Sequence, residues 1–378
     1  MQRLFLVALS LAAGCGGLAP LGVPCVTPLE TAQPTIALGS AGGTFVYGSE
    51  GLPSGLFVHR FDATDTLTWT ATLPPPGAHG LRRFAVAGDS AFFFDDDSEQ
   101  VTILRDGAIT FAGSQRPDCN AGTFAADGDR LRVFGSSGQP SHFCTYELSG
   151  DGTSDSLVTF DADTPFSVGS AASGGFLVVA QAGLIRYDAG GNRLWTHAGT
   201  FVSDALEAGG SVYGFTYTAS NVTLVRIGLD GQGEDQVRSW DHDANNASDS
   251  ELKIVGLLPT SDGIIVAVEQ VYSYKKELLR VDAAGVRWVS TLDPLATNPL
   301  LGVELGSQLL ILHDEAELLA FDVDGNQRWQ KAAPIDAAIG SDDRPHVADT
   351  KALDECRDVL RVSTLDATGA VQSTWSAR

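Results

Sequence analysis

The six tryptophans of this chain recur at nearly equal intervals, each after an apolar stretch and a turn rich in Asp and Gly. They are Trp69, Trp195, Trp240, Trp288, Trp329 and Trp375. The last five are separated by 45, 48, 41 and 46 residues, and the 126 residues between the first two span about three such intervals. Two weaker copies fill that gap, ending at Phe111 and Phe160. The chain therefore contains eight units of similar length.

Each unit has the pattern of four short strands. Residues 300–329, LLGVELGSQLLILHDEAELLAFDVDGNQRW, place turns at Gly306, around Glu315 and at Gly325. Four-stranded units of about 40–45 residues are typical of propeller blades, and blades must stack around an axis to bury both faces. We predict an all-β fold, an eight-bladed β-propeller of four-stranded antiparallel blades over residues 31–378. The six tryptophans are predicted to pack between blades.

The phrase strand–Asp–x–x–Gly–x–x–Trp, as in LIRYDAGGNRLW and LLAFDVDGNQRW, resembles the repeat of the PQQ-like, or quinoprotein-like, propeller family. Eight such repeats cover nearly the whole chain after its first 30 residues. The dehydrogenases of that family resemble one another in a pair of adjacent cysteines near the quinone, which this sequence lacks. The resemblance therefore implies the fold, and we expect no cofactor and no enzymatic activity.

Two segments have oxygen side chains at the spacing of a calcium loop. The weak metal candidate is Asp241, Asp243, Asn245 and Asp249, where Asn246 replaces the turn glycine and Leu252 occupies the twelfth position. The other segment, Asp322 to Asn326, recurs in sister units as Asp188–Gly191 and Asp282–Gly285. We therefore interpret it as a turn capped by its own Asp. The seven histidines are spread along the chain without metal-ligand spacing.

The N-terminus has the pattern of a targeting segment. A basic start and an apolar run lead to Leu11-Ala12-Ala13-Gly14-Cys15, which resembles a bacterial lipoprotein signal. We expect residues 1–14 to be a signal peptide, Cys15 to carry lipid, and residues 15–30 to form a flexible tether. An ordinary secretory signal is the alternative. Gly16 favours the outer membrane, so we expect an exported, lipid-anchored protein facing the periplasm or the cell surface.

Lipid at Cys15 leaves four cysteines, which allow three connectivities. Cys119 and Cys144 both fall on the same side of the third unit, and ring closure makes the first and eighth units neighbours. We predict the disulfides Cys119–Cys144 and Cys25–Cys356.

The two faces of the predicted ring differ. With strands A to D running outward, the A–B and C–D turns form one face, here called the tight-turn face. The D–A and B–C connections form the other, the insertion face, because it carries the longest segments. They are residues 48–55, 73–80, 135–142, 241–251, 272–277 and 349–356. Lys275-Lys276 is expected to lie in an exposed turn there.

Binding residues favour variable loops on a rigid scaffold, so the insertion face is the expected working surface. We expect a monomer that binds other envelope proteins or an unknown ligand there, as a non-catalytic binding or scaffold protein. One alternative is a scaffold lipoprotein of outer-membrane β-barrel assembly, and another is a divergent enzyme with its site in the propeller channel. A net charge of −23, from 24 basic and 47 acidic residues, excludes nucleic acid as a partner.

Overall fold

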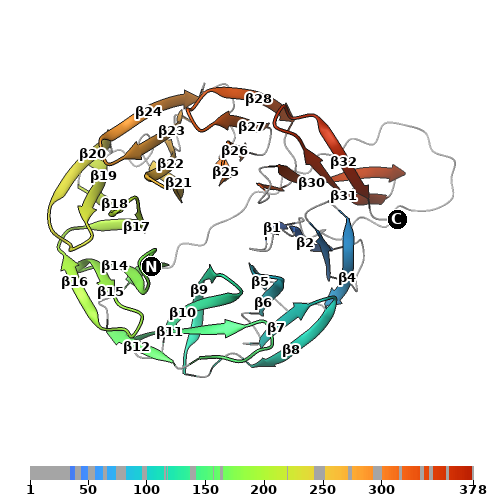
Figure 1. The fold of residues 1–378 in the computed structure, drawn as a ribbon, viewed down its shortest axis with the longest axis horizontal. Helices are drawn as coiled ribbons and strands as arrows, with labels where there is room; N and C mark the ends of the chain where they lie inside the picture. Colours follow the sequence, from blue (N-terminus) through green and yellow to red (C-terminus); the bar gives the residue numbers. More distant parts are fainter. Residues whose placement is uncertain are drawn as a thin grey trace, which may run out of the picture.

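The computed structural model shows a ring of eight four-stranded antiparallel sheets, each with its strands in sequence order from the axis outward (Figure 1). This confirms the predicted eight-bladed propeller. The structure describes residues 35–38, 44–49, 56–62, 66–73, 82–95, 100–114, 116, 118–136, 142–155, 157–161, 165–218, 220–241, 252–270, 275–292, 300–314, 317–332, 336–339, 344–354 and 357–376. Its described part forms no helix long and apolar enough to cross a membrane.

The strands of the first four blades have the following bounds. Blade 1 contains β1 (Thr35–Leu38), β2 (Thr44–Ser49), β3 (Leu56–Phe61) and β4 (Leu67–Leu73). Blade 2 contains β5 (Arg82–Ala87), β6 (Ser90–Asp95), β7 (Gln100–Arg105) and β8 (Ala108–Ser114). Blade 3 contains β9 (Asn120–Asp127), β10 (Arg130–Ser136), β11 (His142–Ser149) and β12 (Val158–Asp161). Blade 4 contains β13 (Pro165–Ser170), β14 (Phe176–Ala180), β15 (Gly183–Tyr187) and β16 (Arg193–His197).

The strands of the last four blades follow the same order. Blade 5 contains β17 (Phe201–Ala208), β18 (Ser211–Tyr217), β19 (Asn221–Gly228) and β20 (Glu234–Asp241). Blade 6 contains β21 (Leu252–Pro259), β22 (Gly263–Gln270), β23 (Lys275–Asp282) and β24 (Gly285–Leu292). Blade 7 contains β25 (Leu300–Leu305), β26 (Leu309–Asp314), β27 (Glu317–Asp322) and β28 (Gln327–Ala332). Blade 8 contains β29 (Asp336–Ile339), β30 (Pro345–Asp354), β31 (Arg357–Leu365) and β32 (Val371–Ser376).

The core is divided among the seams between blades. Strand β26 shows why, since Leu310 and Leu312 pack toward blade 6 while Leu309 and Ile311 pack toward blade 8. Successive side chains of a strand point to opposite faces, and both faces of a blade are covered by neighbours. The middle strands therefore read as continuous apolar runs. The outermost strands alternate between exposed and half-buried positions, as in β28.

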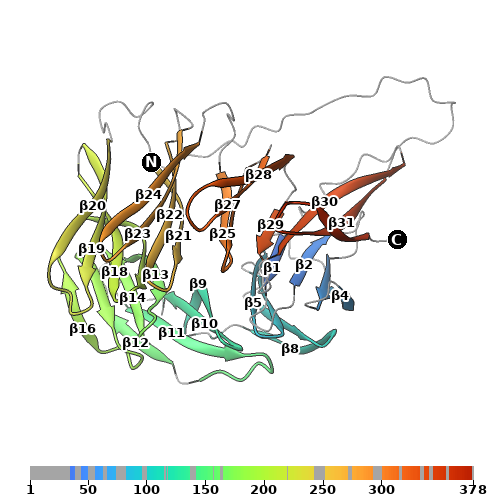
Figure 2. The ribbon, with the colours of Figure 1, turned by 45° about the horizontal axis from the view of Figure 1, so that its top comes forward.

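The ring closes by packing between blades 8 and 1, because β1–β4 and β29–β32 form separate sheets and share no strand. In Figure 2 the strands β29 and β1 lie beside each other. Trp375 of β32 lies 4.7 Å from the His59 ring and 5.4 Å from the Phe61 ring, measured between ring centroids. Burial lowers the pKa of His59 to about 4, so this imidazole is neutral at pH 7 and its Nδ1 contacts Thr70 at 2.8 Å.

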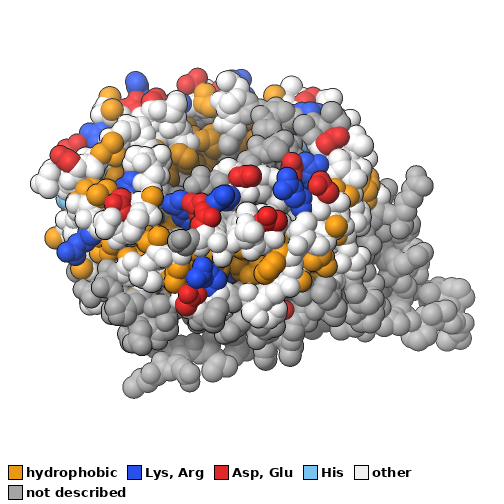
Figure 3. Space-filling view, turned by 60° about the horizontal axis from the view of Figure 1, so that its bottom comes forward, with side chains coloured by type: hydrophobic (Ala, Val, Ile, Leu, Met, Phe, Trp, Pro, Cys, Tyr) orange, Lys and Arg blue, Asp and Glu red, His pale blue; other side chains and the backbone are white. Residues whose placement is uncertain are grey.

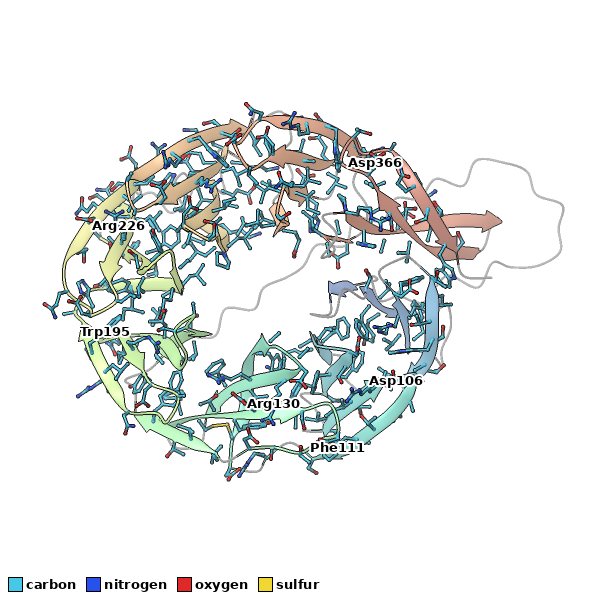
Figure 4. All side chains as sticks on the ribbon, viewed as in Figure 1. Asp106, Phe111, Arg130, Trp195, Arg226 and Asp366 are labelled. Carbon is cyan, nitrogen blue, oxygen red and sulfur yellow. A yellow bond between two sulfur atoms is a disulfide. The ribbon has the colours of Figure 1, made fainter. Side chains whose placement is uncertain are left out.

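Tryptophans on the fourth strands lie against the C–D turn of the next blade. The indole N–H groups of Trp195, Trp288 and Trp329 donate to turn carbonyls of the following blade at 2.8, 3.1 and 3.0 Å. Trp288 stacks over Gly325 so closely that a Cβ built there would lie 2.7 Å from the indole. Figure 4 shows Trp195 on the outer part of the ring, where blade 4 meets blade 5.

Trp240 differs from Trp195, Trp288 and Trp329. It lies near the far end of β20 rather than near its start, and its indole N–H donates to the Glu277 carboxylate of blade 6 at 2.8 Å. It still packs in the seam between blades 5 and 6. Its spacing along the chain therefore matches the repeat, but its position across the blade does not.

Replacing Gly325 by Ala tests the contact between turn and tryptophan. Gly325 has φ of +81°, and an added Cβ would also overlap Trp288. We expect Gly325→Ala to lower the free energy of unfolding by about 2–4 kcal/mol, the sum of left-handed strain and overpacking. The matched control is Gly210→Ala, because Gly210 has φ of +76° but open space around its Cβ position. It should cost only about 1 kcal/mol in denaturant unfolding, and equal losses at the two sites would contradict the packing role.

Cys119 and Cys144 are joined by a disulfide in the structure, as the sequence predicts. Both cysteines are fully buried in the seam between blades 2 and 3. Cys144 lies in β11, the third strand of blade 3, and Cys119 immediately precedes β9, the inner strand. The bond therefore links the start of the inner strand to the third strand. Cys15, Cys25 and Cys356 lie outside the described residues, as do the predicted signal peptide and tether.

Removing this disulfide should destabilise the protein measurably. For a loop of 25 residues the chain-entropy model gives about 3–4 kcal/mol. We expect the double variant Cys119→Ala and Cys144→Ala to lose about that much in denaturant unfolding. Treating the wild-type protein with reductant should produce a similar loss. A double variant that unfolds at the wild-type midpoint would show that the bond contributes nothing.

Candidate functional site

The tight-turn face is tied together by arginines from the third strands. Arg60 of blade 1 reaches Asp89 of blade 2 at 2.5 Å, and Arg280 of blade 6 donates to the Val323 carbonyl of blade 7 at 3.1 Å. Arg226 contacts the carbonyls of the β23–β24 turn in the same way. Each of these bonds crosses a seam. These bonds satisfy side-chain and carbonyl groups of the turns. The tight-turn face therefore stabilises the contact between neighbouring blades.

The turn aspartates have the same structural role. One carboxylate oxygen of Asp322 accepts the backbone N–H groups of Asp324 and Asn326 at 3.0 and 2.8 Å, and Asp366 does the same in blade 8. These bonds satisfy the carboxylate inside its own turn. The interpretation of this segment as a turn therefore agrees with the geometry.

Acidic and basic side chains are intermixed over the described surface in Figure 3. Among the described residues, no group of three His, Cys, Asp or Glu side chains is placed to hold a metal ion. Of the weak calcium candidate only Asp241, the last residue of β20, is described. Asp243, Asn245 and Asp249 lie outside the described residues.

The insertion-face ends of blades 6 and 7 bury charge. The prediction that Lys275-Lys276 forms an exposed turn is wrong for Lys276, which lies inside β23 with 2% of its side chain exposed. Its ammonium contacts the Asp314 carboxylate of blade 7 at 2.7 Å. Lys275 remains accessible, with 44% of its side chain exposed. Sequence alone missed the buried pair because its partner lies 38 residues away on another blade.

A second buried carboxylate lies at the same end of the neighbouring seam. Glu277 accepts from Arg238 at 3.0 Å, from Trp240 at 2.8 Å and contacts Lys275 at 3.2 Å. Burial alone would raise the pKa of Glu277, but these donors hold it below its usual value. Glu277 is therefore charged and held in place by the end of blade 5.

Two other expected insertions differ from the structure. Residues 349–354 of the segment 349–356 are the end of β30, paired in register with β31. There Arg361 donates two N–H groups to the Asp349 carboxylate, and the distance from its Nε to Oδ1 is 2.6 Å. The expected loop at 272–277 likewise ends at the start of β23. The remaining connections between β2 and β3, β4 and β5, β10 and β11, and β20 and β21 lie outside the described residues.

A cluster of titratable groups lies where the inner strands of blades 7 and 8 meet. It comprises Glu304 of β25, His313 of β26 and Asp336 of β29. His313 Nε2 lies 3.8 Å from an Asp336 carboxylate oxygen, too far for a hydrogen bond, and its buried Nδ1 has no partner. Burial lowers the pKa of His313 below its usual value despite both nearby aspartates, so the imidazole is neutral at pH 7.

Glu304 is the unusual member of this cluster. It is half-buried on the side of β25 that faces blade 8, since its register partner Ile311 packs against Ala337 and Ile339 of β29. Burial, and secondarily the charge of Asp336, raise the pKa of Glu304 to about 7. Strongly shifted groups beside a charged partner are typical of functional sites. The signal in the sequence was an acid inside the apolar strand LLGVEL.

Comparison with known proteins identifies the fold of this chain and does not identify a family or an activity. No family model matches the chain, and no curated protein matches it. Among solved structures, apo AztD from Citrobacter koseri has a TM-score of 0.50 at 12% identity over 85% of this chain and 92% of that one. Dihydro-heme d1 dehydrogenase NirN in complex with DHE has a TM-score of 0.51 at 12% identity, over 76% of this chain and 64% of that one. A catalytically inactive variant of virginiamycin B lyase from Staphylococcus aureus with quinupristin has a TM-score of 0.49 at 10% identity. The match covers 77% of this chain and 94% of that one.

The neighbouring structures are β-propellers, and NirN, with a TM-score of 0.51, is named as a dehydrogenase. The prediction that the chain is not an enzyme is therefore wrong as an inference from the propeller repeat, because the same fold supports catalysis in NirN. At 12% identity the likeness shows the fold alone and carries no activity over to this chain.

The raised pKa of Glu304 makes a prediction for stability. The folded state binds this proton more tightly than the unfolded chain, whose glutamate has its usual value of 4.5. The stabilisation is therefore complete below pH 4.5 and is lost as the pH rises through about 7. We expect Glu304→Gln to be more stable than wild type at pH 8, by about 1–3 kcal/mol, and equal to it at pH 4.5. Denaturant unfolding at both pH values measures this.

The control for that comparison is Asp324→Asn, an exposed carboxylate on the tight-turn face of the same blade. It should show no such pH-dependent gain. A Glu304→Gln protein that loses stability equally at both pH values would contradict the raised pKa.

Proposed function

We propose that this chain is an exported, lipid-anchored propeller of the quinoprotein-like type that binds a ligand or partner protein of the cell envelope through its insertion face. The observation that carries the proposal is the contrast between the two ends of the strands. At the tight-turn face, tryptophans, arginines and turn aspartates satisfy one another across the seams. At the insertion-face ends of the strands, Lys276, Asp314 and Glu277 are buried in polar contacts that link blades 5, 6 and 7.

Buried ionisable groups support a binding role because they add little to stability. A buried pair such as Lys276–Asp314 costs desolvation that its attraction does little more than offset. An apolar seam would hold blades 6 and 7 together equally well. Charges kept at this cost, at the strand ends opposite the tight turns, are consistent with selection for a surface that recognises a ligand or partner.

Photo-crosslinking from the two faces tests the proposal. A photoreactive amino acid replaces Lys275 on the insertion face, and in the matched control it replaces Leu194 near the tight-turn face, which is 57% exposed. Each full-length protein is expressed in its host cells and irradiated. We expect one defined adduct from position 275 that purified partner or ligand competes away, and none from position 194. Adducts from position 194 alone would overturn the assignment of the face.

Fractionation of the same cells tests the anchor separately. Lipid at Cys15 should keep the protein with the membranes, and Cys15→Ser should release it into the soluble envelope fraction. A Cys15→Ser protein that stays with the membranes would contradict lipid anchoring. That outcome leaves the face assignment unaffected.

A further inference from the structure

We propose that the seam between blades 8 and 1 is an acid-sensitive closure of the ring, which opens when the histidines buried in it take up protons. Blade 1 is the first and blade 8 the last along the chain, so no connection between consecutive strands spans this closing seam. Every other seam is crossed by the segment that joins one blade to the next. The opening is a property of the ring and is independent of the ligand or partner proposed above.

The closing seam has the shortest inner strands of the ring. Strands β1 and β29 contain four residues each, whereas the other six inner strands contain six to eight. Blade 8 contributes the small side chains of Ala338 and Ala348 to the packing against blade 1. Less apolar surface is therefore available here to offset the cost of a buried charge.

Two buried histidines lie in this seam, one from each blade. His59 of β3 and His346 of β30 have 3% and 4% of their surface exposed. His59 faces blade 8, because its ring centroid lies 4.7 Å from that of Trp375. His346 lies on the same face of β30 as Ala348, which packs against blade 1. Protonation of either histidine therefore places positive charge between the two blades.

The strands around His59 bring neutral side chains to it. Its register partners in blade 1 are Val46 and Thr70, and Thr70 Oγ1 contacts its Nδ1 at 2.8 Å. Phe57 and Trp375 lie against the imidazole, at 4.4 and 4.7 Å between ring centroids. Burial among these groups lowers the pKa of His59 to about 4. The closed seam therefore holds this imidazole in its neutral form.

The described charged groups on the strands and turns of this seam have partners of their own. They are Arg60 with Asp89, Asp62 with the Thr66 N–H, Asp336 with the Ala337 N–H, and Asp349 with Arg361. Arg344 directly precedes β30, and a cation there cannot stabilise an imidazolium. His346 has its Nδ1 3.2 Å from Thr364 Oγ1. Protonation of both histidines would add charge of one sign to the same seam.

Two histidines in other seams are better compensated. His313 shares the seam between blades 7 and 8 with Glu304, which takes up a proton as the pH falls through about 7 and so stabilises that seam in acid. His197, between blades 4 and 5, has its Nε2 2.9 Å from the Glu234 carboxylate and its Nδ1 3.0 Å from the Gly231 carbonyl. Both N–H groups of an imidazolium at His197 would find acceptors. Acid should therefore act first on the closing seam.

Proton uptake favours the opened ring. Once exposed, His59 has its usual pKa of 6.5, whereas in the closed seam burial lowers it to about 4. The stability that neutral His59 gives the seam is therefore complete above pH 6.5 and is lost as the pH falls toward 4. Between pH 7.5 and pH 5 the population of opened rings should rise roughly thirtyfold from His59 alone.

Hydrogen exchange of the purified full-length protein at pH 7.5 and pH 5, with exchange times scaled for the intrinsic rate, tests the proposal. Each blade needs both neighbours for burial, so amides of blades 8 and 1 should lose protection when the seam opens. We expect protection of β2, β3, β30 and β31 to fall roughly thirtyfold or more at pH 5. Protection of β14, β15, β18 and β19 should stay the same. An equal fall in all eight blades, or no fall in blades 8 and 1, would overturn the proposal.

The variant His59→Gln identifies the group that takes up the proton. Its amide can still contact Thr70 but carries no charge, so the roughly thirtyfold share of the fall should disappear. Adding His346→Gln should reduce the fall further. The matched control is His197→Gln, which should show the same fall as wild type. A fall that persists in full in His59→Gln, or that His197→Gln abolishes, would refute the role of the closing seam.

A variant that weakens the seam at every pH still gives a clear result, because the measured quantity is the ratio of protection at two pH values within one protein. The predicted Cys25–Cys356 bond does not prevent the opening. Cys25 lies ten residues before β1, so such a bond limits the width of the gap and leaves the seam free to expose its histidines.

Discussion

The stacking of a tryptophan on the turn of the next blade holds this ring together. A propeller has no single core, and each blade depends on two neighbours for burial. The Trp288–Gly325 contact shows that one copy of the motif contacts two neighbouring blades. Its tryptophan packs on the glycine of the next blade, and its own glycine lies against the tryptophan of the preceding blade. The Asp of the motif caps the turn that presents the glycine. The repeat therefore encodes a contact between copies rather than a structure within one.

This constraint separates the two faces. Because the C–D turns must fit under the preceding tryptophan, they stay short and their polar groups are satisfied locally. The B–C and D–A connections carry no such requirement, so length and charge can vary there. The buried pair Lys276–Asp314 and the network around Glu277 lie on that side. A binding surface is therefore more readily built at this end of the strands.

Much of the fold could be predicted, and much less of the site. Blade number, strand order and the Asp-capped turns follow from the spacing of tryptophans and from local hydrogen bonding, which a single repeat already contains. Trp240 shows the limit: it has the right spacing but lies at the other end of its strand, on Glu277. The sequence predicts Lys276 in an exposed turn because it shows the charge of the lysine. It does not show that Asp314 of the next blade lies within contact distance.

What the sequence by itself determined is the ring: eight copies of one local pattern, with partners fixed by repetition. What only the tertiary structure decided is which polar residues from different copies meet. Glu304, His313 and Asp336 are ordinary residues in their own strands. They become a cluster because blade 8 closes onto blade 7, and the desolvation and repulsion that raise the pKa of Glu304 exist only in that seam. The local sequence pattern repeats along the chain and can be recognised in it. The electrostatics of a seam depend on which residues of two different blades come into contact, and the sequence alone does not show this.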